Sequence, residues 1–123
     1  MAKILIIDDN QTFLDSLCGH INENYPALQV RTCNDPLKSL AMITPDLDLL
    51  LLDLEMPGMD GGKLLNFAVE RGVPKGRIII LSGRDADYLH EKFPMGECLA
   101  VLNKNEAKQQ SVFNMILAAL QQK

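Results

Sequence analysis

Three aspartates at the ends of apolar runs are the first candidates for chemistry in this sequence. Asp8 and Asp9 follow KILII, and Asp53 follows LLLL. Two carboxylates about 4 Å apart repel by roughly 4 kcal/mol at an effective dielectric constant near 20. A cluster of three therefore needs a cation or raised pKa values. Because no His or Cys lies near them in the sequence, these hard oxygen ligands favour Mg²⁺.

A serine and a lysine occupy equivalent positions in the second half of the chain. Ser82 ends the run RIIILS, and Lys104 follows the run CLAVLN. Alone, such a serine is usually a helix cap and such a lysine a solvated surface residue. Together with the acids they supply what a phosphoryl group requires: a nucleophile, a divalent cation, a hydroxyl donor and a compensating positive charge. The combination predicts a Mg²⁺ site that handles phosphate.

Five apolar runs of strand length position these residues, and they alternate with longer segments of helical period. Four runs are almost continuously apolar, as strands covered by helices on both faces should be. The remaining run, LQVRTC, alternates between apolar and polar residues, which predicts an edge strand. The predicted strands are 3–8, 28–33, 48–53, 77–82 and 98–103.

This alternation predicts a single α/β domain over residues 1–123, built on a doubly wound, five-stranded parallel sheet. With 28–33 at one edge, the strand order is 2-1-3-4-5 with right-handed crossovers, the flavodoxin-like arrangement. Ligands of such sheets bind at the carboxyl ends of strands 1 and 3, where the order reverses. The three aspartates lie at that point.

Helices are predicted from apolar periodicity and end signals. Asn10 can cap a helix over 11–24. Asp35 followed by Pro36 opens a second helix. The side chains that this second helix should bury are Leu37, Leu40 and Ala41.

Three further helices are predicted: one from about Gly62 to Gly72, one over 85–93 and one over 107–121. The residues through which the last helix should pack are Val112, Ile116, Ala119 and Leu120, with Phe113 and Leu117 toward its flank.

The composition limits the classes of function. A formal net charge of −4 argues against direct nucleic-acid binding by this domain, because such proteins concentrate Lys and Arg. The three cysteines lie outside any metal-ligand spacing, so neither a disulfide framework nor a zinc site is indicated. The chain begins without a signal-peptide core, and no apolar run has membrane-spanning length. We therefore expect a soluble, cytoplasmic protein that does not insert in a membrane.

The motifs resemble those of the receiver domain of two-component response regulators. The resemblance covers essentially the whole chain, through ILIIDDN, DLEMPGMDG, the LSG that closes the fourth strand, and the lysine after the fifth. It implies that Asp53 is a phospho-acceptor, supplied by a sensor histidine kinase, a phosphotransfer protein or a small donor. It also implies that the domain switches a downstream output and is not an enzyme beyond its own phosphoryl transfer and dephosphorylation.

The resemblance assigns the metal ligands. Mg²⁺ would be held directly by Asp9, Asp53 and the backbone carbonyl of Glu55, with Asp8 acting largely through water. The Glu55 side chain is interpreted equally well as a solvated turn residue or as a charge that slows or shapes dephosphorylation near an attacking water.

The resemblance also assigns the groups that contact the phosphoryl group. Lys104 would pair first with the carboxylate and then with a phosphoryl oxygen. Ser82 would move to hydrogen-bond the phosphoryl group. Backbone N–H groups near Leu54 and Gly83 would add further donors.

Two positions depart from the family pattern. An aromatic residue usually lies three positions before the lysine, but here Val101 has a stiff side chain with little surface to swing. A proline commonly follows the lysine through a cis bond, but here Asn105 follows, so we predict a trans peptide between Lys104 and Asn105. A non-proline residue there also resembles members with a C-terminal helix-turn-helix domain, which predicts a DNA-binding output domain beyond this chain.

Receiver domains often signal through the face formed by the fourth helix, fifth strand and fifth helix. We therefore expect this face to be available for a homodimer, with Phe113 and Leu117 contributing to it.

Two other functions fit parts of the pattern. A pseudo-receiver would keep the fold as a protein-interaction module without the chemistry; the five signature side chains oppose this, and the missing aromatic and proline favour it. A haloacid-dehalogenase-like phosphatase also combines an aspartyl nucleophile, a hydroxyl, a lysine and acids. It needs an early D-x-D-x-[TV] motif and a late acidic pair, whereas here the pair comes first and Asp53 leads DLEMP.

Overall fold

A five-stranded parallel sheet with the order β2-β1-β3-β6-β7 is the centre of the computed structural model, which describes residues 2–84, 86–93, 96–105, 107 and 111–122. Counted along the chain, this is the predicted order 2-1-3-4-5, and the alternating run 28–33 is confirmed as an edge strand. The strands are β1 (Lys3–Ile7), β2 (Gln29–Cys33), β3 (Leu49–Asp53), β6 (Ile78–Ser82) and β7 (Ala100–Asn103).

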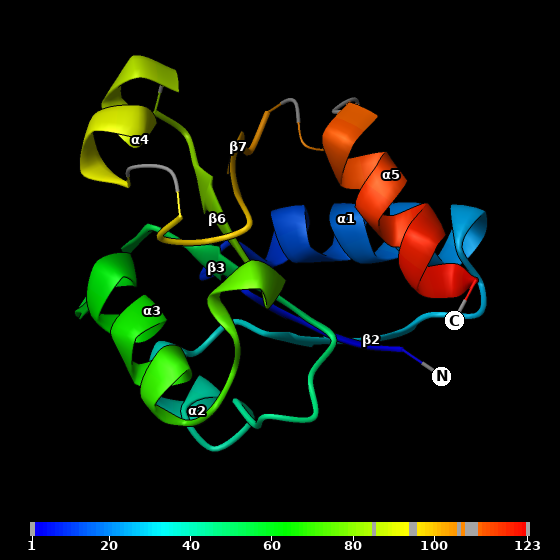
Figure 1. Cartoon of the computed structure of the whole chain (residues 1–123), viewed down its shortest axis with the longest axis horizontal. Coiled ribbons are helices and arrows are strands. Elements are labelled where there is room, and N and C mark those ends of the chain that lie inside the picture. The colour runs from blue at the N-terminus through cyan, green and yellow to red at the C-terminus, as the bar shows by residue number, and fades with distance from the viewer. Residues whose placement is uncertain (1, 85, 94–95, 106, 108–110, 123) are drawn as a thin grey trace.

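Helices cover both faces of this sheet (Figure 1). One apolar cluster joins the sheet to α1 and α5, and the other joins it to α3 and α4. The helices are α1 (Gln11–Asn24), α2 (Pro36–Ser39), α3 (Gly61–Glu70), α4 (Ala86–Lys92) and α5 (Ser111–Gln121), with a short 3₁₀ turn at Lys75–Arg77. Residues 85 and 108–110 of the predicted helices lie outside the described residues. No helix in the described ranges is both long and apolar enough to cross a membrane.

The LLLL run is apolar throughout because both of its faces are covered. Leu49 and Leu51 belong to the cluster under α1 and α5, whereas Leu50 and Leu52 belong to the cluster under α3 and α4. All four side chains are at most 1% exposed. Alternation of side chains along a strand thus places one pair on each face.

The predicted start signals of the helices are largely confirmed. The Asn10 side chain accepts a hydrogen bond from the Phe13 N–H at the start of α1, and Asp35 caps α2 with Pro36 in the first turn. Helix α3 begins at Gly61 with Asp60 as its cap, one residue before the predicted start. Just beyond its end, Gly72 has the positive φ of +102° expected for a helix-terminating glycine.

The buried face predicted for α5 is confirmed at Leu120 and in part at Ile116, which packs against the core, but Val112 and Ala119 are exposed. Phe113 and Leu117 are fully buried, whereas Val112 is 54% exposed. Both residue sets have helical spacing, so periodicity alone does not choose between two faces about 100° apart. The face that carries the large Phe113 ring removes more apolar surface from water, and that face packs on the sheet.

The buried stripe predicted for α2 is confirmed only at Leu40, which packs against the cluster under α3 and α4, whereas Ala41 is exposed. The helix ends after one turn at Ser39, and Leu37 is 71% exposed. The Ser39 hydroxyl donates to the carbonyl of Pro36 at 2.5 Å, and the Leu40 N–H donates to Leu37 instead. Because the Pro36 carbonyl is the group that the Leu40 N–H would use in a continuing α-helix, the helix stops there.

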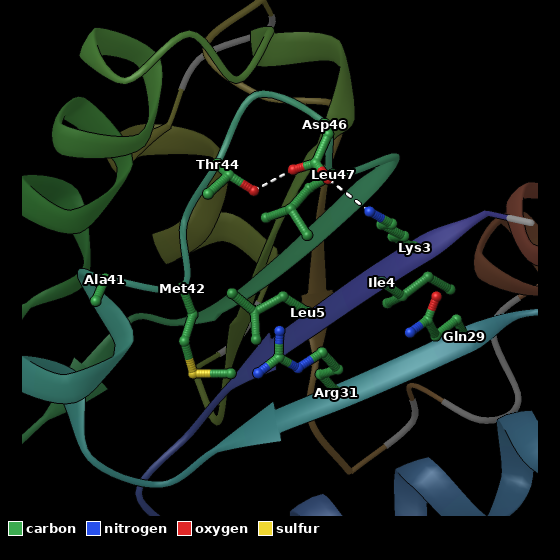
Figure 2. A pocket seen from close by; sticks show the side chains of 10 residues that line it. All are labelled: Lys3, Ile4, Leu5, Gln29, Arg31, Ala41, Met42, Thr44, Asp46 and Leu47. Atoms are coloured by element: carbon green, nitrogen blue, oxygen red, sulfur yellow. Dashed lines mark hydrogen bonds and ion pairs between the residues drawn. The ribbon is translucent and has the colours of Figure 1, made fainter.

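A short α2 leaves part of the sheet open beside β1 and β2, and Figure 2 shows the resulting cavity. Its volume is about 350 Å³, and Leu5, Arg31, Met42 and Leu47 are among its lining residues. Lys3 and Gln29, the first residues of their strands, also line it, so the cavity lies toward the amino ends of the strands.

A small hairpin leads from β3 into α3 and forces a close approach of backbone segments. The hairpin strands are β4 (Glu55–Met56) and β5 (Met59–Asp60), which pair antiparallel. The Gly61 N–H then donates to the Leu54 carbonyl at 3.1 Å. A Cβ atom on Gly61 would lie 2.6 Å from the Leu54 Cα and 2.9 Å from the Asp53 carbonyl oxygen.

We predict that Gly61→Ala destabilises the fold by about 2 kcal/mol or more, because backbone atoms cannot move aside as a side chain can. Gly19→Ala is the control, since nothing lies within 4 Å of a Cβ there. In the interior of α1 this change should stabilise by about 0.5–1 kcal/mol. Urea unfolding of both variants measures the difference, and equal stabilities would contradict the close approach.

Candidate functional site

Three aspartates meet at the carboxyl end of the sheet. Asp8 and Asp9 directly follow β1, and Asp53 is the last residue of β3, the neighbouring strand. One carboxylate oxygen from each lies within 4.8 Å of the others. The structure thus brings together the acids that the strand order predicts at this end.

Two of these carboxylates are almost completely buried. Asp8 is 0% exposed and Asp53 is 2% exposed, whereas Asp9 is exposed. The Oδ1 atoms accept backbone hydrogen bonds, from the Asn10 N–H to Asp8 at 2.9 Å and from the Glu55 N–H to Asp53 at 3.1 Å. Within the described ranges, neither Oδ2 atom has a hydrogen-bond donor in good geometry. These two oxygens therefore depend on nearby positive charge.

Lys104 supplies that positive charge. Its Nζ lies 2.7 Å from Asp8 Oδ2 and 3.6 Å from Asp53 Oδ2. The Lys104 N–H donates to the Ser82 carbonyl at 2.8 Å, which fixes the residue against the end of β6. Burial acts to lower the pKa of Lys104, but the close contact with the Asp8 carboxylate and the charge of Asp53 outweigh it and raise that pKa. The ammonium group therefore stays charged.

The pKa of Asp53 is raised to about 7. Burial of the carboxylate is the largest cause, and the charge of Asp8 adds to it. The Glu55 N–H and the Lys104 charge act in the opposite direction but do not cancel the burial. A cation close to Asp53 would favour the ionised form.

The donor set at this end of the sheet fits Mg²⁺. It offers carboxylate oxygens from three chain positions, and the buried Oδ2 atoms of Asp8 and Asp53 face the Lys104 ammonium. Three acids face one lysine, so the cluster keeps an excess of negative charge. Hard oxygen ligands with this excess charge suit a small divalent cation.

Ser82 and Glu55 form a direct hydrogen bond that the sequence did not predict. The buried Ser82 hydroxyl donates to Glu55 Oε1 at 2.6 Å. The Ser82 Oγ also accepts the Arg84 N–H at 3.0 Å. Each side chain was a candidate by itself, but no sequence pattern links residues on two different strands.

An open cavity of about 320 Å³ gives access to Asp53. Its lining includes Asp53, Glu55, Gly83 and Lys104. The other lining residues are Asn10, Phe13 and Asn105. Sequence reasoning treated Asn10 only as a helix cap. The Phe13 ring centroid lies 4.9 Å from Lys104 Nζ. The cavity of Figure 2 is a separate feature toward the opposite ends of the strands.

The remaining candidates have mixed outcomes. The Leu54 N–H donates to the Leu81 carbonyl at 2.8 Å. Gly83 is exposed and lines the cavity. Val101 is half-buried and packs against the cluster under α3 and α4. The Lys104–Asn105 peptide is trans as predicted, since the described part of the chain has no cis bond.

We predict that Asp53→Asn stabilises the metal-free protein at pH 8 by about 1–3 kcal/mol, and by much less at pH 5. The folded-state pKa of Asp53, about 7, lies above its unfolded value, so the contribution of Asp53 to the free energy of unfolding is present at low pH. This contribution is lost as the pH rises through about 7. Urea unfolding in EDTA measures the difference, which Mg²⁺ should reduce at pH 8. A difference independent of pH would contradict the raised pKa.

A family model described as "Response regulator receiver domain" matches residues 4–116 of the chain. Among curated proteins, the chain is 39% identical over 85 residues to the "Glycerol metabolism activator" of Pseudomonas putida, a match that covers 67% of the chain and 38% of that protein. It is 38% identical over 88 residues to "Response regulator PleD" of Caulobacter vibrioides (strain NA1000 / CB15N), covering 68% of the chain and 19% of that protein.

Solved structures show the likeness of fold. The receiver domain of the Francisella response regulator 1452 has a TM-score of 0.79 at 21% identity and covers 99% of this chain and 98% of that one. A CheY-like response regulator receiver domain protein from Methanospirillum hungatei JF-1 has a TM-score of 0.75 at 22% identity, covering 99% and 95%.

Proposed function

Because the chain belongs to the family of response regulator receiver domains, we propose that it accepts a phosphoryl group on Asp53 and thereby switches a downstream output. The observation that carries this proposal is the placement of the Asp53 carboxylate. It lies at the end of a buried strand, within reach of Lys104 and beside two further acids, and it lines an open cavity. A carboxylate with only a structural role would not need this set of neighbours.

The proposed step is a nucleophilic displacement at phosphorus. A carboxylate oxygen of ionised Asp53 forms a new bond to the phosphorus, while the bond between the phosphorus and the donor's leaving atom breaks. With a phosphohistidine of a sensor histidine kinase or phosphotransfer protein, the imidazole nitrogen leaves with the bonding electron pair. The protein contributes mainly position and charge compensation, as is general for phosphoryl transfer.

Asp9, Asp53 and the backbone carbonyl of Glu55 are the proposed Mg²⁺ ligands, with Asp8 acting largely through water. When bound, Mg²⁺ supplies charge neutralisation between the carboxylates and the phosphoryl oxygens. Lys104 already contacts Asp8 and lies within ion-pair distance of Asp53. We propose that it pairs with a phosphoryl oxygen once Asp53 is modified.

The output is proposed to lie in a separate domain or partner. The chain spans 38% and 19% of the two curated relatives described above. A C-terminal DNA-binding domain is the output that the residue after Lys104 favours, and the acidic receiver itself would not touch nucleic acid. We propose that this signalling takes place in the cytoplasm.

A homodimer through α4, β7 and α5 is the proposed mode of self-association, but with different residues from those expected. Phe113 and Leu117 are buried and cannot form a contact surface. Val112 and Met115 lie one turn apart on α5 and are 54% and 70% exposed, and Leu99, just before β7, is 41% exposed. These apolar side chains are the candidates for the contact.

We predict that incubation with Mg²⁺ and acetyl phosphate adds one phosphoryl group to the wild type and none to Asp53→Asn. Intact-mass spectrometry measures the adduct, and Asp46→Asn, an exposed aspartate beside Lys3, is the control that should remain modified. EDTA should abolish the adduct. A wild type without an adduct, or an equal adduct on Asp53→Asn, would exclude Asp53 as the acceptor. Steady turnover of a phosphomonoester would instead indicate a phosphatase.

We predict that Val112→Ser with Met115→Ser weakens dimerisation of the phosphorylated protein about tenfold, because the contact loses apolar area. Leu37→Ser is the control, since Leu37 is 71% exposed on α2. Sedimentation velocity over a concentration series measures the dimer fraction. If the double variant dimerises as the wild type does, α5 is not the contact.

A further inference from the structure

Two hydrogen bonds hold the Ser82 hydroxyl in the structure. Its proton is donated to Glu55 Oε1 at 2.6 Å, and its oxygen accepts the Arg84 N–H at 3.0 Å. The side chain is 0% exposed, so water does not compete for these bonds. A hydroxyl has a single proton. While Ser82 donates to Glu55, it therefore cannot donate to a phosphoryl group on Asp53.

We propose that Glu55 is a positioning residue that holds the Ser82 hydroxyl in the unphosphorylated arrangement and releases it when Asp53 is phosphorylated. This inference rests on the proposed acceptor role of Asp53. It assigns to Glu55 a contact through its side chain, distinct from the proposed contact of its backbone carbonyl with Mg²⁺. Substitution of the side chain leaves that carbonyl in place.

Charge explains why phosphorylation would release the hydroxyl. The Glu55 N–H donates to Asp53 Oδ1 at 3.1 Å, and Glu55 lines the same cavity as Asp53 and Lys104. A phosphoryl group brings about −1.5 to −2 charges and strong acceptor oxygens. It repels the Glu55 carboxylate and offers the hydroxyl a better acceptor. Both effects favour transfer of the hydrogen bond from Glu55 to the phosphoryl group.

Arg84 would carry the change away from the site. Its N–H contacts the Ser82 hydroxyl, and its carbonyl accepts a hydrogen bond from Asn103 Nδ2 of β7 at 3.3 Å. Its guanidinium lies over the Tyr88 ring of α4, 4.4 Å from the ring centroid. Arg84 is thus connected to both β7 and α4. A movement of Ser82 reaches both elements without any aromatic side chain at position 101.

The first test needs no phosphoryl donor and no metal. In ¹H–¹⁵N spectra, Glu55→Ala should shift the Arg84 amide, because the hydroxyl that it contacts loses its acceptor. Glu55→Gln should shift it less, since the amide oxygen still accepts. Glu70→Ala, an exposed glutamate at the end of α3, is the charge-matched control and should leave the Arg84 amide unchanged. An unchanged Arg84 amide in Glu55→Ala contradicts the proposal even if Asp53 is phosphorylated normally.

The second test measures competition for the hydroxyl, with beryllofluoride as a tetrahedral stand-in for the phosphoryl group. Loss of a hydrogen bond to a charged acceptor should raise the apparent beryllofluoride affinity of Glu55→Ala about tenfold. The same substitution in a Ser82→Ala background should raise the affinity by much less, about twofold, because it then relieves only the charge repulsion between Glu55 and beryllofluoride. A double-mutant cycle separates this coupling from a general effect of charge.

Equal affinity gains in the two backgrounds would overturn the proposal, because Glu55 would then act through its charge alone. A wild type that neither binds beryllofluoride nor gains a phosphoryl group from acetyl phosphate would overturn the acceptor role of Asp53 instead.

Discussion

The ion pairs between Lys104 and two buried carboxylates constrain the rest of the site. Asp8 and Asp53 are at most 2% exposed, and their Oδ2 atoms face the Lys104 ammonium. Buried carboxylates this close together repel strongly unless a positive charge lies between them. The carboxyl ends of β1, β3 and β7 must therefore lie level with one another at the same edge of the sheet. The parallel sheet and the bond from the Lys104 N–H to the Ser82 carbonyl provide that alignment.

The same arrangement leaves Asp53 poised between two protonation states. Its pKa of about 7 results from burial that Lys104 and the Glu55 N–H only partly offset. If protein groups fully offset the effect of burial on Asp53, the carboxylate would form a stable ion pair with little tendency to bind a further cation. Incomplete compensation leaves a carboxylate that gains from a further cation, and this links metal binding to the state that can act as a nucleophile. The site thus costs the unliganded fold some stability.

Much of the fold and the set of converging residues could be predicted from the sequence, because strand order follows from local patterns. Alternation in LQVRTC identified an edge, and the continuous apolar runs identified covered strands; together they placed Asp8, Asp9 and Asp53 at one end of the sheet. The details that failed depend on contacts between distant or competing groups. Which face of α5 is buried depended on where the Phe113 ring packs, and the length of α2 depended on one hydroxyl bond of Ser39. The bond between Glu55 and Ser82 joins residues 27 positions apart, and no spacing rule anticipates it.

A route from Asp53 to the surface requires an element with two alternative arrangements that the site can favour unequally. Val101 is a poor candidate, because its side chain is stiff and packs against the core. The Ser82 hydroxyl is a better one, since it has a single proton and two acceptors that compete for it. When the Ser82 hydroxyl changes its acceptor from Glu55 to the phosphoryl group, the free energy gained is only the difference between two charge-assisted hydrogen bonds. Each such bond is worth about 1.5–3 kcal/mol. A complete switch from 1:99 to 99:1 needs about 5.5 kcal/mol. A relay through Ser82 and Arg84 alone would therefore shift the population of α4 arrangements only partly. A complete shift would need further contacts made by the output domain or partner.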